Sequence, residues 1–164
     1  MADMHDLLQT LADRRLTLGS VESMTGGLFA AEATCYPGAS AVFKGAIVSY
    51  SEKVKAEVVG VDPKIIRAYG VVSAPVAQEM AARGREKLGV DVCVSVTGNA
   101  GPSAEPGDAP VGKVYFGFAN EKSVWSFGYD FQGTRQEIRE AAVDMMIAFG
   151  LSHFPQEKQI DEEN

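Results

Sequence analysis

Apolar runs and amphipathic segments alternate along this chain, and polar turn signals separate them. Short apolar runs predict buried strands, whereas apolar residues that recur every three or four positions predict helices. By these patterns, we expect strands at 16–21, 46–50, 91–97, 114–119 and 124–131. We expect helices at 6–13, 28–34, 51–59, from 62 onward, 76–88 and 136–153.

Residues with capping chemistry mark several helix ends. Ser51, Asp62 and Ser73 stand where N-caps are needed, and Gly89 stands where a helix should end. The last two strands are separated by a short polar turn, which predicts an antiparallel hairpin. The order of elements therefore predicts an α/β fold: a single three-layer α/β/α domain with a mixed sheet of about five strands.

The composition of the chain disfavours some classes of function. The chain has 164 residues, 46% of them hydrophobic, and a formal net charge of −7. An acidic chain of this length suits one globular domain and argues against direct binding of nucleic acid, which calls for a basic stripe. We expect no membrane span, because no apolar run reaches the length of a spanning helix. The polar, acidic segment 155–164 is expected to be a disordered tail that follows a domain at 1–154.

Two cysteines, Cys35 and Cys93, lie among apolar neighbours, and we interpret both as buried, reduced thiols. They are too few for a structural zinc site. The N-terminal segment carries acidic residues and lacks a long apolar core, which is unlike a signal peptide. These features together predict a cytoplasmic protein.

The segment 21–27 joins the first strand to the following helix and holds candidate chemistry. Ser23 stands at the strand end, and Thr25, Gly26 and Gly27 complete the turn. Such turns in α/β proteins place ligands and nucleophiles, because backbone N–H groups there lack intrahelical partners. The hypothesis is that Ser23 is a nucleophile beside an oxyanion or anion pocket shaped by Thr25, Gly26 and Gly27; whether Ser23 or Thr25 forms the covalent bond stays open.

Histidine content narrows the choice of base. His5 and His153 are near the two ends of the chain, far in sequence from any strand-end loop. A Ser-His-Asp triad or a His-rich metal site is therefore disfavoured, which leaves lysine, tyrosine and carboxylates. Tyr50 and Lys55 are candidates, because a strand end and the next helical turn can aim side chains at one point. The alternative is that Tyr50 is a core residue and Lys55 a solvated one.

Two further segments could bind a ligand. Gly98, Asn99 and Gly101 follow the third strand, where glycines let the backbone approach a ligand closely; a plain tight turn is the alternative. Arg135 and Arg139 stand one turn apart at the start of the last helix. They predict either an anion clamp, where guanidinium groups and the helix dipole add, or an exposed pair.

Five ordered motifs lie at 21–27, at 48–51 with Lys55 and 60–61, at 70–73, at 95–102 and at 110–112. Together they resemble the C-terminal domain of the competence/damage-inducible protein CinA. The similarity extends from about residue 5 to residue 154, nearly the whole chain. Met24 stands where many members have Cys, and the segment 103–109 varies across the family.

The resemblance implies a metal-independent amidohydrolase without a cofactor. Stand-alone members include bacterial nicotinamide mononucleotide (NMN) deamidases, which release nicotinic acid mononucleotide and ammonia in pyridine nucleotide salvage. It also implies a Ser/Tyr/Lys arrangement, which falls here on Ser23, Tyr50 and Lys55. Arg135 and Arg139 would bind the 5′-phosphate, and amides near Thr25 and Gly26 would hold the oxyanion.

Other functions stay open at this point. One is an amidase acting on a related carboxamide, and another is a catalytically silent binding module associated with competence or DNA repair. The expected partner is a small nucleotide, with no nucleic acid and no membrane. The resemblance and the hairpin edge also predict a homo-oligomer.

Overall fold

A five-stranded mixed sheet forms the middle layer of the domain. The computed structural model describes residues 3–163, with side chains through residue 153. The strand order is β2-β1-β3-β4-β5, with β1 parallel to both β2 and β3 and with β3-β4-β5 antiparallel. The predicted combination of a parallel part and one hairpin is thus confirmed. The strands are β1 (Leu18–Glu22), β2 (Phe43–Val48), β3 (Val92–Gly98), β4 (Lys113–Ala119) and β5 (Val124–Asp130).

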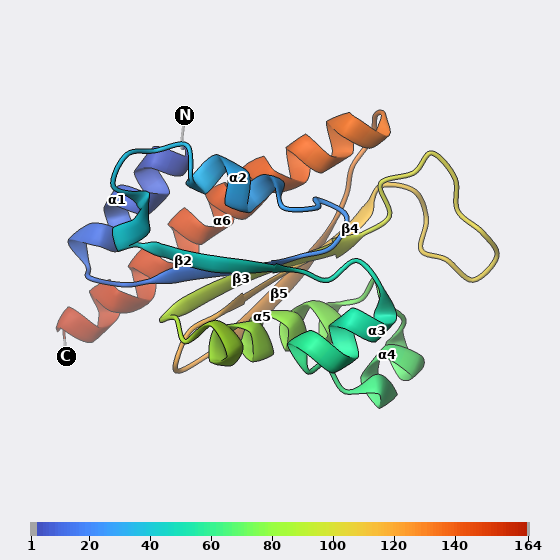
Figure 1. Ribbon diagram of the computed structural model, residues 1–164, viewed down its shortest axis with the longest axis horizontal. Helices are drawn as coiled ribbons and strands as arrows, with labels where there is room; N and C mark the ends of the chain where they lie inside the picture. The colour runs from blue at the N-terminus through green and yellow to red at the C-terminus, as the bar shows by residue number, and fades with distance from the viewer. Residues whose placement is uncertain (1–2, 164) are drawn as a thin grey trace.

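Helices cover both faces of this sheet, which gives the predicted three layers. In Figure 1, α1, α2 and α6 lie on one face, and α3, α4 and α5 lie on the other. No helix in the described part of the chain is long and apolar enough to cross a membrane. The helices are α1 (Met4–Asp13), α2 (Leu28–Ala33), α3 (Glu52–Val54), α4 (Pro63–Tyr69), α5 (Ala74–Leu88) and α6 (Arg135–Glu163), with a 3-10 turn at Ala39–Ala41 and a π-helical turn at Lys55–Val59.

Each face of the sheet has its own apolar core. The larger core joins α1, α2 and α6 to the sheet and includes Phe29 and Phe116. The smaller core lies under α5 and includes Val21 and Met80. At Gly84 a Cβ would clash with the side chain of Val21, so the glycine lets α5 sit directly on β1. Helices therefore pack tightly against both faces of the sheet, and this packing fixes the positions of the strand ends.

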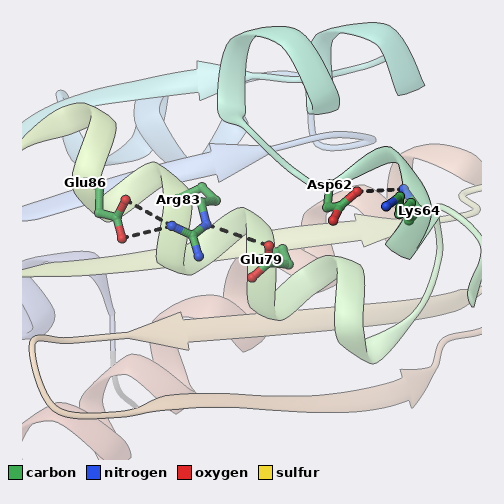
Figure 2. A network of polar contacts seen from close by, with 5 residues as sticks. All are labelled: Asp62, Lys64, Glu79, Arg83 and Glu86. Atoms are coloured by element: carbon green, nitrogen blue, oxygen red, sulfur yellow. Dashed lines mark hydrogen bonds and ion pairs between the residues drawn. The ribbon is translucent and has the colours of Figure 1, made fainter.

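The predicted helix caps are confirmed. The Ser51, Asp62 and Ser73 side chains each accept a hydrogen bond from a backbone N–H of the helix that follows. Gly89 ends α5 in the left-handed conformation, with φ of 64°. On the outer surface of α5, Arg83 forms ion pairs with Glu79 and Glu86, near the Asp62 cap of α4 (Figure 2).

Several element boundaries differ from the sequence pattern. β2 begins at Phe43 and ends at Val48, so Tyr50 stands beyond the strand and not in the core. The segment expected as one helix at 51–59 changes from α to π at Lys55. α6 has bounds Arg135–Glu163, past the expected end near 153. The side chains from 154 onward lie outside the described residues, and the disorder expected at 155–164 stays a prediction.

One cysteine prediction is wrong. Cys93 is buried, and burial raises its pKa far above the usual range, as expected for a core thiol. Cys35 is free but exposed. It follows the last turn of α2, where the neighbouring Ala33 takes the buried position and Cys35 turns outward. The apolar neighbours of Cys35 in sequence therefore gave a misleading signal.

Candidate active site

A cavity of about 290 Å³ opens where the carboxyl ends of β1 and β2, the loop after β3 and the start of α6 meet. These segments gather at the right-hand end of the molecule in Figure 1. The carboxyl ends of parallel strands are where open α/β sheets place their ligands. Six residues singled out from the sequence line this cavity: Ser23, Tyr50, Lys55, Gly98, Asn99 and Arg135.

Ser23 and Lys55 are in direct contact. Lys55 Nζ donates to Ser23 Oγ at 2.9 Å and to the Ser49 carbonyl oxygen at 2.6 Å. Both side chains are buried, with Ser23 6% and Lys55 2% exposed. Lys55 is therefore not the solvated helix residue that the sequence left as an alternative. Its amine is close enough to exchange a proton with the serine hydroxyl.

Burial also changes the acidity of this lysine. Removal from water lowers the pKa of Lys55 from 10.5 to about 8, and the nearby Glu52 carboxylate opposes that change. The charged form of an amine loses more solvation than the neutral form does, so burial favours the neutral base. An amine with this pKa is neutral in roughly a tenth of the molecules at pH 7, enough to act as a general base.

Tyr50 lines the same cavity, but its hydroxyl points to a different partner. Its side chain is 65% exposed, and its hydroxyl accepts a hydrogen bond from Arg135 at 3.1 Å. Arg135 also donates to the Gly101 carbonyl oxygen. The structure thus joins Tyr50, Arg135 and the loop after β3 into one wall of the cavity. Proton exchange between Ser23 and Lys55 can be direct, without passage through this phenol.

The sequence reasoning missed Glu22, which lies fully buried at the end of β1. Its carboxylate accepts hydrogen bonds from two hydroxyls and three backbone amides. Three of these donors are the N–H groups of Gly27, Phe29 and Ala30 at the start of α2. The Glu22 carboxylate therefore bonds the backbone N–H groups at the start of α2 that have no partner within the helix, and these groups do not need a bound ligand as acceptor. The sequence feature that could have revealed this role is a glutamate directly after the apolar run that forms the first strand.

A hydrogen bond to Glu22 also fixes the side chain of Thr25. The Thr25 hydroxyl donates to Glu22 at 2.8 Å, and its side chain is fully buried. Thr25 does not line the cavity, whereas Ser23 does. Of the two hydroxyls in this turn, that of Ser23 lies at the cavity, and that of Thr25 is bound to Glu22 within the turn.

The glycine amides expected to bind an anion are engaged elsewhere. Gly26 N–H donates to the Ser23 carbonyl at 3.0 Å, and Gly27 N–H donates to Glu22 at 3.1 Å. Within the described residues, the amides of Met24 and Thr25 make no hydrogen bond. The donors that remain for an oxyanion are therefore next to Ser23 and not at the glycines. Gly26 and Gly27 instead supply left-handed backbone at φ of 60° and 102°.

The two arginines of α6 have separate roles. Arg135 lines the cavity, whereas Arg139 lies behind the serine turn. Arg139 donates to the carbonyl oxygens of Met24 at 2.9 Å and Thr25 at 3.3 Å. The structure thus supports an anion-binding position for Arg135 alone. Arg139 ties the serine turn to the start of α6.

Neither histidine lies at the cavity. His5 contacts the ring of Tyr36, and His153, which is partly buried on α6, stacks with Trp125 of β5. Among the described residues, the side chains that could share a metal ion are Asp3, His5 and Asp6, all exposed at the start of α1. Asp3 and Asp6 already form the capping box of that helix.

The fold and the cavity define a three-layer α/β domain that pairs a buried serine with a buried lysine at the carboxyl end of its parallel strands. The family model described as the CinA C-terminal domain matches residues 2–152, so the chain belongs to that family. This agrees with the resemblance seen in the sequence motifs.

Individual relatives agree with this assignment. A CinA-like protein of Chlorobium limicola is 46% identical over 142 residues, which cover 81% of this chain and 33% of that protein. A CinA-like protein of Mycobacterium marinum is 49% identical over 106 residues, which cover 65% of this chain and 24% of that protein. The chain thus spans about a third or less of the length of these curated relatives.

Solved structures with this fold are of similar size to the chain. The competence/damage inducible protein CihA of Agrobacterium tumefaciens is 28% identical, with a TM-score of 0.87 over 91% of this chain and 92% of that one. The competence or damage-inducible protein of Enterobacter asburiae is 26% identical, with a TM-score of 0.86 over 93% of this chain and 98% of that one. The α/β fold is therefore the fold of these proteins.

Proposed function

We propose that the domain is an amidohydrolase that converts NMN and water to nicotinic acid mononucleotide and ammonia. The observation that carries the proposal is the 2.9 Å contact between Ser23 Oγ and Lys55 Nζ inside a cavity. A hydroxyl beside an amine of lowered pKa is a nucleophile with its own base. The choice of NMN as substrate rests on the resemblance of the sequence motifs to stand-alone NMN deamidases of the family.

The reaction has two stages. Neutral Lys55 accepts the proton of Ser23 as Oγ bonds to the carboxamide carbon. The lysine ammonium then gives that proton to the nitrogen as the C–N bond breaks, and ammonia leaves. Lys55 next takes a proton from water, whose oxygen attacks the acyl ester. The bond to Ser23 breaks, the serine regains its proton, and nicotinic acid mononucleotide is released.

Two backbone amides would stabilise the tetrahedral intermediate. The N–H of the residue after a serine nucleophile is a common oxyanion donor, and that residue here is Met24. The Thr25 N–H is the second candidate donor. One such donor contributes about 3 kcal/mol to transition-state stability. The positive pyridinium ring helps further, because it withdraws electrons from the carboxamide carbon.

The size and charge of the cavity fit a mononucleotide. A volume of about 290 Å³ lies near the low end for ligand sites, which suits one nucleotide better than two. Arg135 lines the cavity and would bind the 5′-phosphate, with Tyr50 and the loop after β3 holding its guanidinium in place. Gly98 and Asn99, also on the cavity wall, would contact the substrate.

The test measures ammonia release from NMN by the purified chain and by Ser23→Ala and Lys55→Ala. We expect Ser23→Ala to lose about 10⁴-fold or more in kcat, and Lys55→Ala about 10²- to 10⁴-fold. Lys53→Ala is the matched control, because Lys53 stands on the same helical segment with a side chain 80% exposed. Full activity in either active-site variant would refute the assigned roles.

The same assay separates the rival functions. Nicotinamide, nicotinamide riboside and NMN differ by the ribose and the phosphate, so turnover of the smaller compounds at equal efficiency would favour a broader carboxamide amidase. Absence of ammonia from all three, together with capture of a protein partner, would favour a silent binding module. A much higher efficiency with NMN than with the two smaller compounds supports the proposal.

The oligomeric state and the cellular location are part of the same proposal. The outer strand β5 leaves a sheet edge with exposed residues such as Val124 and Tyr129, which supports a homo-oligomer. Light scattering measures that state directly.

We place the protein in the cytoplasm, since both of its cysteines are free thiols and NMN is an intracellular metabolite.

A further inference from the structure

More basic than acidic side chains line the cavity. Lys55 and Arg135 are basic, and Glu52 is the single carboxylate among the described residues that line it. A ligand that carries positive charge therefore meets two cationic side chains and one anionic side chain. The place of that charge on the ligand, relative to Glu52, decides whether the site attracts or repels it.

Glu52 lies at the same end of the cavity as the Ser23–Lys55 pair. It is three residues before Lys55 on one helical segment, and side chains at that spacing share a helix face. Its charge reaches the lysine, because the Glu52 carboxylate works against the effect of burial on the Lys55 pKa. Arg135 is held away from this pair, on the wall formed with Tyr50 and Gly101.

The Glu52 carboxylate is available to a ligand. It makes no hydrogen bond or ion pair to any residue whose side chain the structure describes. The neighbouring Glu57 differs, because it pairs with Lys53 at 3.9 Å and does not line the cavity. The chain thus offers two glutamates on one segment, of which Glu52 lines the cavity and Glu57 does not.

The inference rests on the proposed function, which fixes where the substrate charges fall. With the carboxamide carbon at Ser23, the attached ring lies beside Lys55 and Glu52, and the phosphate lies a ribose away toward Arg135. A pyridinium ring placed next to Lys55 without a counter-charge would be disfavoured. We propose that Glu52 pairs with the positive ring, so that the site selects N-alkylated pyridinium carboxamides over neutral aromatic carboxamides of the same shape.

This arrangement matches the two ends of the substrate separately. Arg135 is opposite in charge to the phosphate, and Glu52 is opposite in charge to the ring. The acidic balance of the whole chain does not produce this selectivity, since only Glu52 contributes a carboxylate to the described cavity wall. A neutral ring would keep the phosphate contact and lose the contact with Glu52.

The test compares two ligands of one shape. NMN has the cationic ring, and 3-carbamoylphenyl C-riboside 5′-phosphate has a neutral ring on the same ribose phosphate. Equilibrium binding of both is measured by calorimetry with Ser23→Ala protein, which prevents turnover, alone and combined with Glu52→Gln, Glu52→Lys or Glu57→Gln. Ammonia release from NMN by the otherwise wild-type chain is measured in parallel.

We expect Glu52→Gln to weaken NMN binding about 2- to 5-fold, the size of a partly exposed ion pair, and to leave the neutral ligand unchanged. Glu52→Lys should weaken NMN binding about 10-fold, because it replaces attraction by repulsion. Glu57→Gln should change neither ligand. The same NMN preference in the Glu52 variants as in the parent would overturn the inference, as would equal losses for both ligands.

Failure of the inference and failure of the proposed function give different results. If NMN neither binds nor yields ammonia, the proposed function is wrong and the inference falls with it. If NMN is deamidated but the preference for the cationic ring does not depend on Glu52, the proposed function stands and the inference alone is wrong.

Discussion

Lys55 Nζ lies 2.9 Å from Ser23 Oγ and 2.6 Å from the Ser49 carbonyl oxygen, so one amine joins the turn after β1 to the end of β2. Ser49 is itself fixed, because its amide and hydroxyl both donate to the Glu22 carbonyl, at 2.7 and 3.1 Å. The parallel pairing of β1 with β2 thus sets the distance between serine and lysine.

The rate should depend on pH through Lys55. Because the neutral amine is the active form and the Lys55 pKa is about 8, kcat/KM should rise with pH below 8 and level off above it. The rise should be about tenfold per pH unit on the acid side, as expected for one essential base. Initial rates of ammonia release between pH 6 and 10 measure this profile.

Circular dichroism over the same pH range is the control, since unfolding would imitate a loss of base. A midpoint near 6 in folded protein would assign the role of base to another group.

The burial that makes Lys55 a better base should also reduce the stability of the fold near neutral pH. The folded-state pKa of Lys55 is about 8, against 10.5 when exposed, so the unfolded chain binds more protons between these values. The buried amine therefore costs stability at pH 7, and the cost disappears as pH rises past 10.5. Relative to Lys55→Met, the wild type should gain about 3 kcal/mol between pH 7 and pH 10.5.

Urea unfolding of both proteins at several pH values measures this difference, and the other titrating groups cancel between the two. Lys53→Met is the control and should show no such change, because Lys53 is exposed. A wild-type gain of less than about 1 kcal/mol would contradict the lowered pKa.

Local signals in the sequence were sufficient for most of the fold. Caps at Ser51, Asp62 and Ser73 are decided by the few residues around them, and the structure confirms all three. The hairpin of β4 and β5 is likewise signalled by adjacent strands and a short polar turn. The strand expected to end at Tyr50 ends two residues earlier, at Val48, because its apolar run continues past the last paired residue.

The site required information from distant parts of the chain. Lys55 is buried because the turn after β1, far away in sequence, packs over it, and no pattern near residue 55 contains that fact. The different roles of Arg135 and Arg139 arise from which element each one faces. Cys35 shows the same limit, since apolar neighbours do not tell which side of a helix end is exposed.

Replacement of Glu22 tests the internal support of the serine turn. In Glu22→Gln, one oxygen becomes an NH₂ group that faces either the Gly27 and Phe29 amides or the Ala30 amide, depending on which oxygen is replaced. A buried network left with opposed donors should lose about 3 kcal/mol or more in the free energy of unfolding. Turnover should fall as well, because Ser23 directly follows this carboxylate.

Urea unfolding measures the loss. Glu32→Gln on α2, the helix whose first turn donates to Glu22, is the matched control, since burial and the nearby Asp144 and Asp3 raise the Glu32 pKa and its charge is not favoured there. A Glu22→Gln variant as stable as the wild type would show that the five hydrogen bonds do not support the turn.

The two arginines of α6 should respond differently to substitution. Arg135→Met removes a guanidinium from the cavity wall, so the KM for NMN should rise about 10- to 100-fold, the range for one lost charge-assisted hydrogen bond. The KM for nicotinamide riboside, which lacks the phosphate, should change little. Arg139→Met frees the Met24 and Thr25 carbonyls, so kcat should fall by a similar factor for both substrates. Steady-state kinetics with the two substrates measure these effects, and Arg83→Met on the outer face of α5 is the control. If Arg139→Met instead raised KM for NMN alone, the phosphate would contact both arginines and the separation of their roles would be wrong.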